Sequence, residues 1–249
     1  MDKNLSIYSD KSVVDYYRTQ SELFASEAHL VERYFPERAR LLDIGVGGGR
    51  TAGPLSARAS EYVGLDYSAA MVDACRARFP GLDFREANAA DLSQFTDSSF
   101  DCAMFAFNGI DYITVDAQRA DCFREIARVL APGGMFVFSS HNARTLVYRA
   151  SLADAAPHQV VWRLTRSIYK SIGLVFRNVG SGAYARGEGY IVDPTHGGLE
   201  TYVSTPATIV PQLAAAGFEL VETIGGHYPA RASDVMEPWF YYAARKTAS

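Results

Sequence analysis

Short apolar runs alternate with amphipathic stretches along the first part of the chain. The predicted strands of this part comprise residues 41–44, 62–66, 84–87, 99–107 and 135–139. The predicted helices comprise residues 51–60, a stretch that opens at Ser68, and residues 117–130. The run over 99–107 is mostly apolar, as expected of a strand that is covered on both faces. Strands that alternate with helices of this length predict a parallel α/β sheet with right-handed crossovers.

Two flanking segments have a different pattern. Residues 12–35 form an amphipathic helical stretch before the first strand. Residues 141–205 combine a basic helical stretch around 162–170 with glycine-rich sequence. Long segments inside a compact domain are usually functional, so we expect 141–205 to cover the site as a lid. The chain then closes with a predicted helix over 206–216 and predicted strands over 218–224 and 239–245.

Composition narrows the class of protein. With 249 residues, 48% hydrophobic and 21% charged, the chain resembles an ordinary globular domain with room for an insertion. A net charge of −4 provides no global field that would attract nucleic acid or an anionic membrane. The first residues lack the apolar stretch of a secretory signal, so we expect a cytoplasmic protein. The cysteines lack metal-type spacing, and we expect no metal and three reduced core thiols, at Cys75, Cys102 and Cys122.

The turn after the first predicted strand carries four glycines among the five residues from Gly45 to Gly49. Glycine lets a ligand approach the backbone closely, so this cluster favours binding. The spacing from Gly47 to Ala52 satisfies the dinucleotide pattern, and Asp66 is placed to bind the ribose of NAD. Asp43, however, directly precedes the turn, where its charge opposes a pyrophosphate and favours a cationic ligand. The residues by themselves leave both ligands open.

Several motifs in register resemble those of the class I S-adenosylmethionine-dependent methyltransferases. Residues 43–49 match the pattern D-x-G-x-G-x-G of that family, and the resemblance covers about residues 40–140. The further motifs, in order, are Asp66, Ala87–Leu92, Ser99–Asp101 and Pro132–Gly134. Each of these motifs is weak alone, but the five together are specific.

The resemblance implies an α/β fold, namely a Rossmann-like seven-stranded mixed sheet with helices on both faces and an antiparallel last strand. It implies one domain over residues 1–249. We expect an N-terminal helical cap over 1–38, a cofactor-binding core over 39–140, a substrate lid over 141–205 and closing elements over 206–249.

The same resemblance implies S-adenosyl-L-methionine as cofactor and S-adenosyl-L-homocysteine as product. Asp43 and the glycines would contact the methionyl part, and Asp66 would accept hydrogen bonds from both ribose hydroxyls. Asn88 replaces the usual aspartate of the family, and its amide oxygen can accept the same hydrogen bond from adenine. The expected cofactor-binding residues are Tyr17, Asp43, Gly45, Gly47, Gly49, Asp66, Tyr67, Asn88, Ala89 and Phe105.

The acceptor should lie beyond the carboxyl ends of the strands. His141 directly follows the fifth predicted strand, and we expect it to act as the general base. The alternative role for this histidine is to hold its loop by bonding a nearby carbonyl. The expected acceptor contacts are Asn108, Asp111, Tyr112, Asn142 and His196, although helix capping and ordinary packing are the alternatives for Asp111 and Tyr112.

We therefore expect methyl transfer to an oxygen or nitrogen of a small molecule, such as a natural product or a sugar. The alternatives are an NAD-dependent oxidoreductase and a non-catalytic S-adenosylmethionine-binding protein. Arg163, Arg166 and Lys170, near Trp162 and Tyr169, form a basic aromatic patch that we interpret as a solvated helix face rather than a site for a phosphorylated acceptor or RNA. The expected partners are a small-molecule acceptor, with no nucleic acid and no membrane, and the chain is expected to be a monomer or homodimer.

Overall fold

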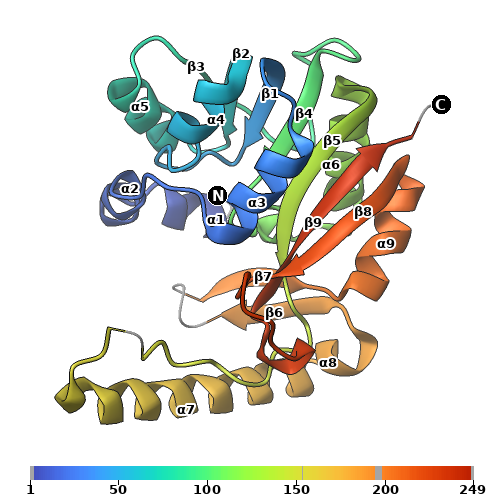
Figure 1. Ribbon diagram of the computed structural model, residues 1–249. Helices are drawn as coiled ribbons and strands as arrows, with labels where there is room; N and C mark the ends of the chain where they lie inside the picture. Colours follow the sequence, from blue (N-terminus) through green and yellow to red (C-terminus); the bar gives the residue numbers. More distant parts are fainter. Residues whose placement is uncertain (1–2, 153, 194–197, 248–249) are drawn as a thin grey trace.

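The computed structural model describes residues 3–152, 154–193 and 198–247 (Figure 1). Within these residues a seven-stranded sheet has the order β3-β2-β1-β4-β5-β9-β8, and β9 runs antiparallel to both of its neighbours. This confirms the predicted mixed sheet. The strands are β1 (Ala39–Ile44), β2 (Ala59–Asp66), β3 (Asp83–Glu86), β4 (Phe100–Phe105), β5 (Leu130–His141), β8 (Phe218–Gly225) and β9 (Trp239–Lys246).

Helices cover both faces of the sheet because the strands bury side chains on both sides. In β1, Leu42 and Ile44 belong to one core cluster, whereas Leu41 belongs to the other. Successive side chains of a strand point to opposite faces, so an apolar run of this kind needs two covering layers. The covering helices are α3 (Ala25–Tyr34), α4 (Ala52–Arg58), α5 (Ala69–Arg78), α6 (Asp116–Val129) and α9 (Pro206–Ala215).

The N-terminal cap consists of separate helices, α1 (Lys3–Tyr8) and α2 (Lys11–Arg18), followed by α3. The expectation of one helical stretch over 12–35 is therefore wrong between Thr19 and Phe24. A tertiary contact occupies the backbone of this link, because the Arg50 guanidinium donates to the carbonyl of Glu22. Such contacts override a helical pattern that is only local.

The segment after β5 forms a long helix and a hairpin. The helix α7 (Pro157–Gly180) extends well beyond the predicted stretch, and it projects from the rest of the molecule, beyond the end of the sheet (Figure 1). A short helix, α8 (Ala183–Arg186), leads into the antiparallel strands β6 (Gly189–Asp193) and β7 (Leu199–Val203), which were not predicted. The hairpin reaches the N-terminal cap, because the Asn4 amide donates to the carbonyls of Glu200 and Tyr112.

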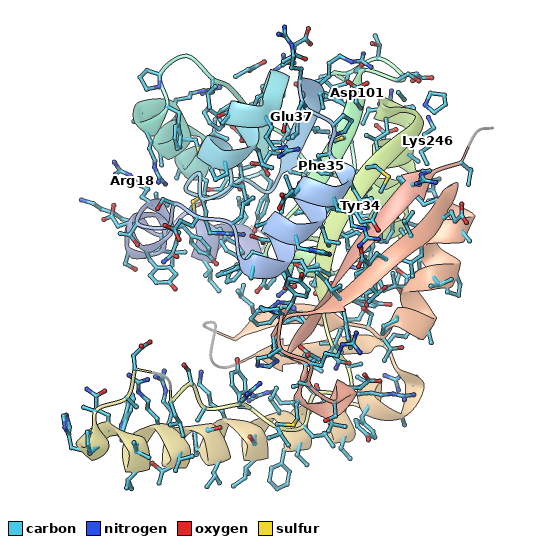
Figure 2. All side chains as sticks on the ribbon, in the orientation of Figure 1. Arg18, Tyr34, Phe35, Glu37, Asp101 and Lys246 are labelled. Atoms are coloured by element: carbon cyan, nitrogen blue, oxygen red, sulfur yellow. The ribbon has the colours of Figure 1, made fainter. Side chains whose placement is uncertain are left out.

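The motif Ser99–Asp101 has a structural role. The Asp101 carboxylate accepts hydrogen bonds from the backbone and the guanidinium of Arg40, with the shortest at 2.7 Å. Figure 2 shows Asp101 at the end of the sheet opposite to α7. This aspartate therefore joins β1 to β4 at their amino ends and lies far from the strand ends where a ligand binds.

Candidate cofactor and acceptor site

A cavity of about 850 Å³ lies at the carboxyl ends of β1, β2 and β4. Its wall includes most of the residues that the sequence predicted as cofactor-binding. Those that line it are Tyr17, Gly45, Gly47, Asp66, Tyr67, Asn88, Ala89 and Phe105. The parallel strands bring these residues together because their carboxyl ends meet at one edge of the sheet.

The glycine turn is held tightly between the sheet and α2. The amide of Gly47 donates to Asp66 Oδ2 at 2.8 Å, and Gly47 has a φ of +54°, a conformation that favours glycine. A Cβ atom on Gly48 would lie 2.5 Å from the carbonyl carbon of Tyr17. Only glycine at this position lets the end of α2 rest on the turn, which places Tyr17 in the cavity wall.

Asp66 combines burial with a position in the cavity wall. Only 6% of this residue is exposed, and each of its carboxylate oxygens accepts one backbone hydrogen bond. Burial raises the pKa of Asp66 to about 6, although the amides of Ser68 and Gly47 favour the charged form. Each oxygen keeps a further lone pair, which suits a ligand that presents two adjacent hydroxyl groups.

Asp43 lies beneath the turn and is not part of the cavity wall. Its Oδ2 accepts hydrogen bonds from Thr51 Oγ1 at 2.6 Å and from the Tyr62 hydroxyl at 2.8 Å. Burial raises the pKa of Asp43 to about 6, and its Oδ1 has no hydrogen-bond partner among the described residues. Gly49 is also outside the wall, because it packs against the ring of Phe79. A direct contact of Asp43 or Gly49 with the cofactor stays a prediction.

Asn88 and Ala89 line the cavity at the end of β3. The Asn88 side-chain oxygen accepts a hydrogen bond from the Ala90 amide at 2.9 Å, which fixes the loop. An amide oxygen has a second lone pair, so this bond leaves room for the predicted hydrogen bond from adenine.

Tyr8 of α1 is a cavity residue that the sequence did not reveal. Its ring packs against those of Tyr17, Tyr67 and Tyr112, at centroid distances of 6.1, 6.2 and 5.5 Å. Burial raises the pKa of the Tyr8 hydroxyl well above its usual value, so this residue stays neutral. Only the tertiary fold brings α1 against η1 (Gly109–Tyr112), and no local pattern signals that contact.

Arg50, which follows the glycine turn, is buried and paired. Its guanidinium forms a bidentate ion pair with Glu27 of α3, at 2.6 and 2.7 Å. Glu27 is fully buried, and it also accepts the backbone amide of Phe24. The ion pair therefore anchors α3 to the turn, and it balances the charge of the only arginine in the described cavity wall.

His141 forms a hydrogen-bonded pair with Asp111. The His141 Nδ1 lies 2.9 Å from Asp111 Oδ2, which also accepts the His141 backbone amide at 2.6 Å. Ser140 Oγ and the Arg119 guanidinium contact the other oxygen of Asp111. Asp111 is fully buried and is not part of the cavity wall, so its expected contact with an acceptor stays a prediction.

The Nε2 side of the His141 ring is directed toward Asn108, which follows β4. His141 Nε2 lies 3.3 Å from Asn108 Nδ2, and the ring of Tyr112 packs edge-on against the imidazole at 6.3 Å. Asn108 has a φ of +59°, and its backbone amide donates to Ser139 Oγ. Backbone strain of this kind is commonly found at functional sites. Tyr112 lines the cavity, whereas His141 and Asn108 lie directly behind it.

The remaining predicted acceptor residues have different outcomes. The amide of Asn142 donates to the carbonyls of Asp234 and Glu237, so this buried side chain holds a loop instead of facing the cavity. His196 lies outside the described residues. No described residue of 141–205 lines the cavity, and the lid function of that segment stays a prediction.

Comparisons with known proteins decide the ligand class. Residues 42–138 match the family model of a methyltransferase domain. These residues are a methyltransferase domain, and the relatives and solved structures support the class I S-adenosylmethionine-dependent family. The match settles the choice that the glycine turn left open, and S-adenosylmethionine is the cofactor of this family.

Individual relatives agree with the family match. A probable S-adenosylmethionine-dependent methyltransferase of Mycolicibacterium smegmatis is 38% identical over 42% of this chain and 39% of its own length. A fatty-acid O-methyltransferase of the same organism is 35% identical over 48% of this chain and 44% of its own length. The chain thus spans less than half of each of these relatives. The CcbJ methyltransferase of Streptomyces caelestis has the same fold, with a TM-score of 0.63 and 20% identity over 97% of this chain and 98% of its own.

The methyltransferase domain has residues that fit the cofactor. The buried Asp66 carboxylate presents free lone pairs to the cavity, and the exposed Gly45 and the half-buried Gly47 line the same wall. Glu86 is a second carboxylate in the wall, and Glu27 neutralises Arg50. The lining therefore suits a cationic sulfonium that carries a ribose diol.

We expect the affinity for S-adenosylmethionine to rise with pH through about 6, the pKa of buried Asp66. In the predicted contact the charged carboxylate would accept hydrogen bonds from both ribose hydroxyls, whereas the protonated form would do so poorly. We therefore expect the affinity to change about tenfold between pH 5 and 7. The free energy of unfolding has the opposite pH dependence. Because burial raises the pKa of Asp66, the contribution of this residue to stability falls as pH rises through about 6.

Calorimetric Kd values across this pH range test the expectation. The change in Kd between pH 5 and 7 should become smaller in Asp66→Asn. It should persist in Asp83→Asn, which changes an exposed carboxylate of β3. A flat profile in the unmodified chain would contradict the assignment of Asp66 to the ribose.

Proposed function

We propose that this domain transfers a methyl group from S-adenosylmethionine to an oxygen or nitrogen of a small molecule. The observation that carries the proposal is the second wall of the cavity, which lies beyond the expected cofactor residues. This wall is formed by Leu5, Tyr8, Tyr112, Thr114, Val115 and Gln118.

The size and lining of the cavity favour a small acceptor. A volume of about 850 Å³ lies within the range of small-molecule sites, and α1 and α2 contribute to its wall. Tyrosine hydroxyls and the Gln118 amide supply polar groups on a mainly apolar surface. One relative is named for O-methylation of a fatty acid, which is itself a small molecule.

In this proposal the chain aligns the acceptor, excludes water and removes a proton. The bound cofactor supplies an electrophilic methyl group on its sulfonium. The Nδ1–H of His141 donates to Asp111, which leaves Nε2 with a lone pair for the acceptor proton. An acceptor that enters past Tyr112 displaces the long 3.3 Å contact between Asn108 and Nε2.

Release of S-adenosylhomocysteine with a screened set of alcohols, carboxylic acids and amines tests the function. With any acceptor found, His141→Ala should lower kcat about 10²- to 10⁴-fold, because a general base contributes that much. The Kd for S-adenosylmethionine should stay within about twofold, because His141 does not line the cofactor wall.

The matched control is His158→Ala, which changes an exposed histidine of α7. Unchanged turnover in His141→Ala would remove this residue from the catalytic machinery. Tight cofactor binding without release of S-adenosylhomocysteine from any compound class would favour the non-catalytic alternative.

A further inference from the structure

The helix α7 carries an uncovered apolar surface. More than half of the large hydrophobic side chains that are exposed in the described residues belong to this one helix. Tyr169 and Phe176 are 79% and 76% exposed, and Ile168 is 61% exposed. Contiguous exposed apolar surface on a protein marks an interaction site. Figure 1 shows that α7 stands away from the sheet along most of its length.

Apolar and basic side chains are segregated around α7. Trp162, Tyr169 and Phe176 are spaced seven residues apart, so they form one line along the helix. Together with the aliphatic side chains next to this line they span roughly 160° of the circumference at 100° per residue. The cationic side chains gather beyond the aromatic line, at Arg163, Arg166, Lys170 and Arg177. The helix contains no aspartate or glutamate.

The third side of α7 is fixed by the preceding loop. Ser171 Oγ accepts the Tyr148 amide at 2.8 Å, and the Asn178 amide donates to the Thr145 carbonyl at 3.0 Å. Between this loop and the helix lies a groove of about 420 Å³ with mainly apolar walls, including Val147, Ile172 and Val175. The loop therefore holds α7 in place and leaves both its apolar face and the groove open.

A second copy of the chain does not suit this surface. The other exposed large hydrophobic residues of the described chain are mostly scattered over separate elements, such as Tyr16, Val192 and Val210. Pairing of α7 with itself is then the remaining way to cover the apolar face. That pairing would bring two helices together that carry only positive charge, and like charges disfavour it.

We propose that α7 binds the surface of an anionic lipid bilayer. Its apolar face enters the acyl region, and its arginines and lysine contact lipid phosphates, as in amphipathic helices that lie in the membrane interface. The groove beside Val147 and Ile172 is suited to an acyl chain. Within the described residues no helix has the combination of length and apolarity that crossing a bilayer requires. The expectation of no membrane partner rested on the net charge of the whole chain. This inference rests instead on the separation of apolar and basic side chains around the single helix α7.

Co-sedimentation of the full chain with vesicles tests the proposal. We expect binding to vesicles of phosphatidylcholine with about one third phosphatidylglycerol, little binding to phosphatidylcholine alone, and release by high salt. The variant Arg166→Glu/Lys170→Glu should lower the partition coefficient at least about tenfold. The variant Ile168→Ser/Phe176→Ser should lower it to a similar extent, because both side chains are exposed and their loss spares the core.

Matched controls separate this surface from general effects. Lys11→Glu/Arg124→Glu makes the same change in net charge elsewhere, and Val192→Ser/Val210→Ser removes exposed hydrophobic groups elsewhere. Both controls should bind vesicles like the unmodified chain. Equal loss in the controls, no binding to anionic vesicles, or a dimer in solution that Ile168→Ser/Phe176→Ser dissociates would each overturn the proposal. Because cofactor affinity is measured separately, failure here leaves the proposed methyl transfer unaffected.

Discussion

Replacement of Asp66 with alanine is expected to weaken S-adenosylmethionine binding by at least about a hundredfold. Hydrogen bonds to a charged group contribute about 1.5 kcal/mol or more each, and the carboxylate is assigned two from the ribose. The same change removes the acceptor of the Gly47 amide, which anchors the glycine turn. Calorimetry or a thermal-shift titration measures the loss.

Two further variants define what Asp66 does. Asp66→Asn keeps one acceptor oxygen, so its affinity for S-adenosylmethionine should lie between those of Asp66→Ala and the unmodified chain. Asp83→Ala, on the exposed edge of the sheet, should leave the affinity unchanged within about twofold. If the folded Asp66→Ala variant bound the cofactor as tightly as the unmodified chain, the ribose would have to bind elsewhere.

Replacement of Glu27 with alanine is expected to lower the free energy of unfolding by about 3–5 kcal/mol. The change leaves Arg50, which is only 8% exposed, with an uncompensated charge in the interior. It also removes the acceptor for the Phe24 amide at the start of α3. Urea unfolding followed by circular dichroism measures the loss.

A neighbouring residue provides the control for this prediction. Glu32 is an exposed glutamate of the same helix, and Glu32→Ala should change stability by less than about 0.5 kcal/mol. The double variant Glu27→Leu/Arg50→Met should be more stable than Glu27→Ala, because it removes the buried charge altogether. Equal losses in Glu27→Ala and Glu32→Ala would show that the ion pair contributes nothing.

Patterns between residues close together in the sequence determined the sheet and one side of the cavity. The seven predicted strands are present, with shifts at their ends such as the start of β5 at Leu130 instead of residue 135. Gly47, Asp66 and Asn88 were predicted as cofactor-binding residues from the resemblance to the methyltransferase family. The structure brings them together because the carboxyl ends of parallel strands meet at one edge of the sheet. The strand pattern was enough to predict the sheet, and the order of the motifs along the chain carried the resemblance that predicted these residues.

Contacts between distant residues decided the rest. Tyr8 joins the cavity through Tyr112, Glu27 pairs with Arg50, and Asp111 pairs with His141. The periodicity of a segment shows that one of its faces is apolar, but it does not show which partner covers that face. For α7 the sequence indicated a basic helix. Only the tertiary structure showed that most of its apolar side chains remain exposed, because exposure depends on how distant segments pack in the folded chain.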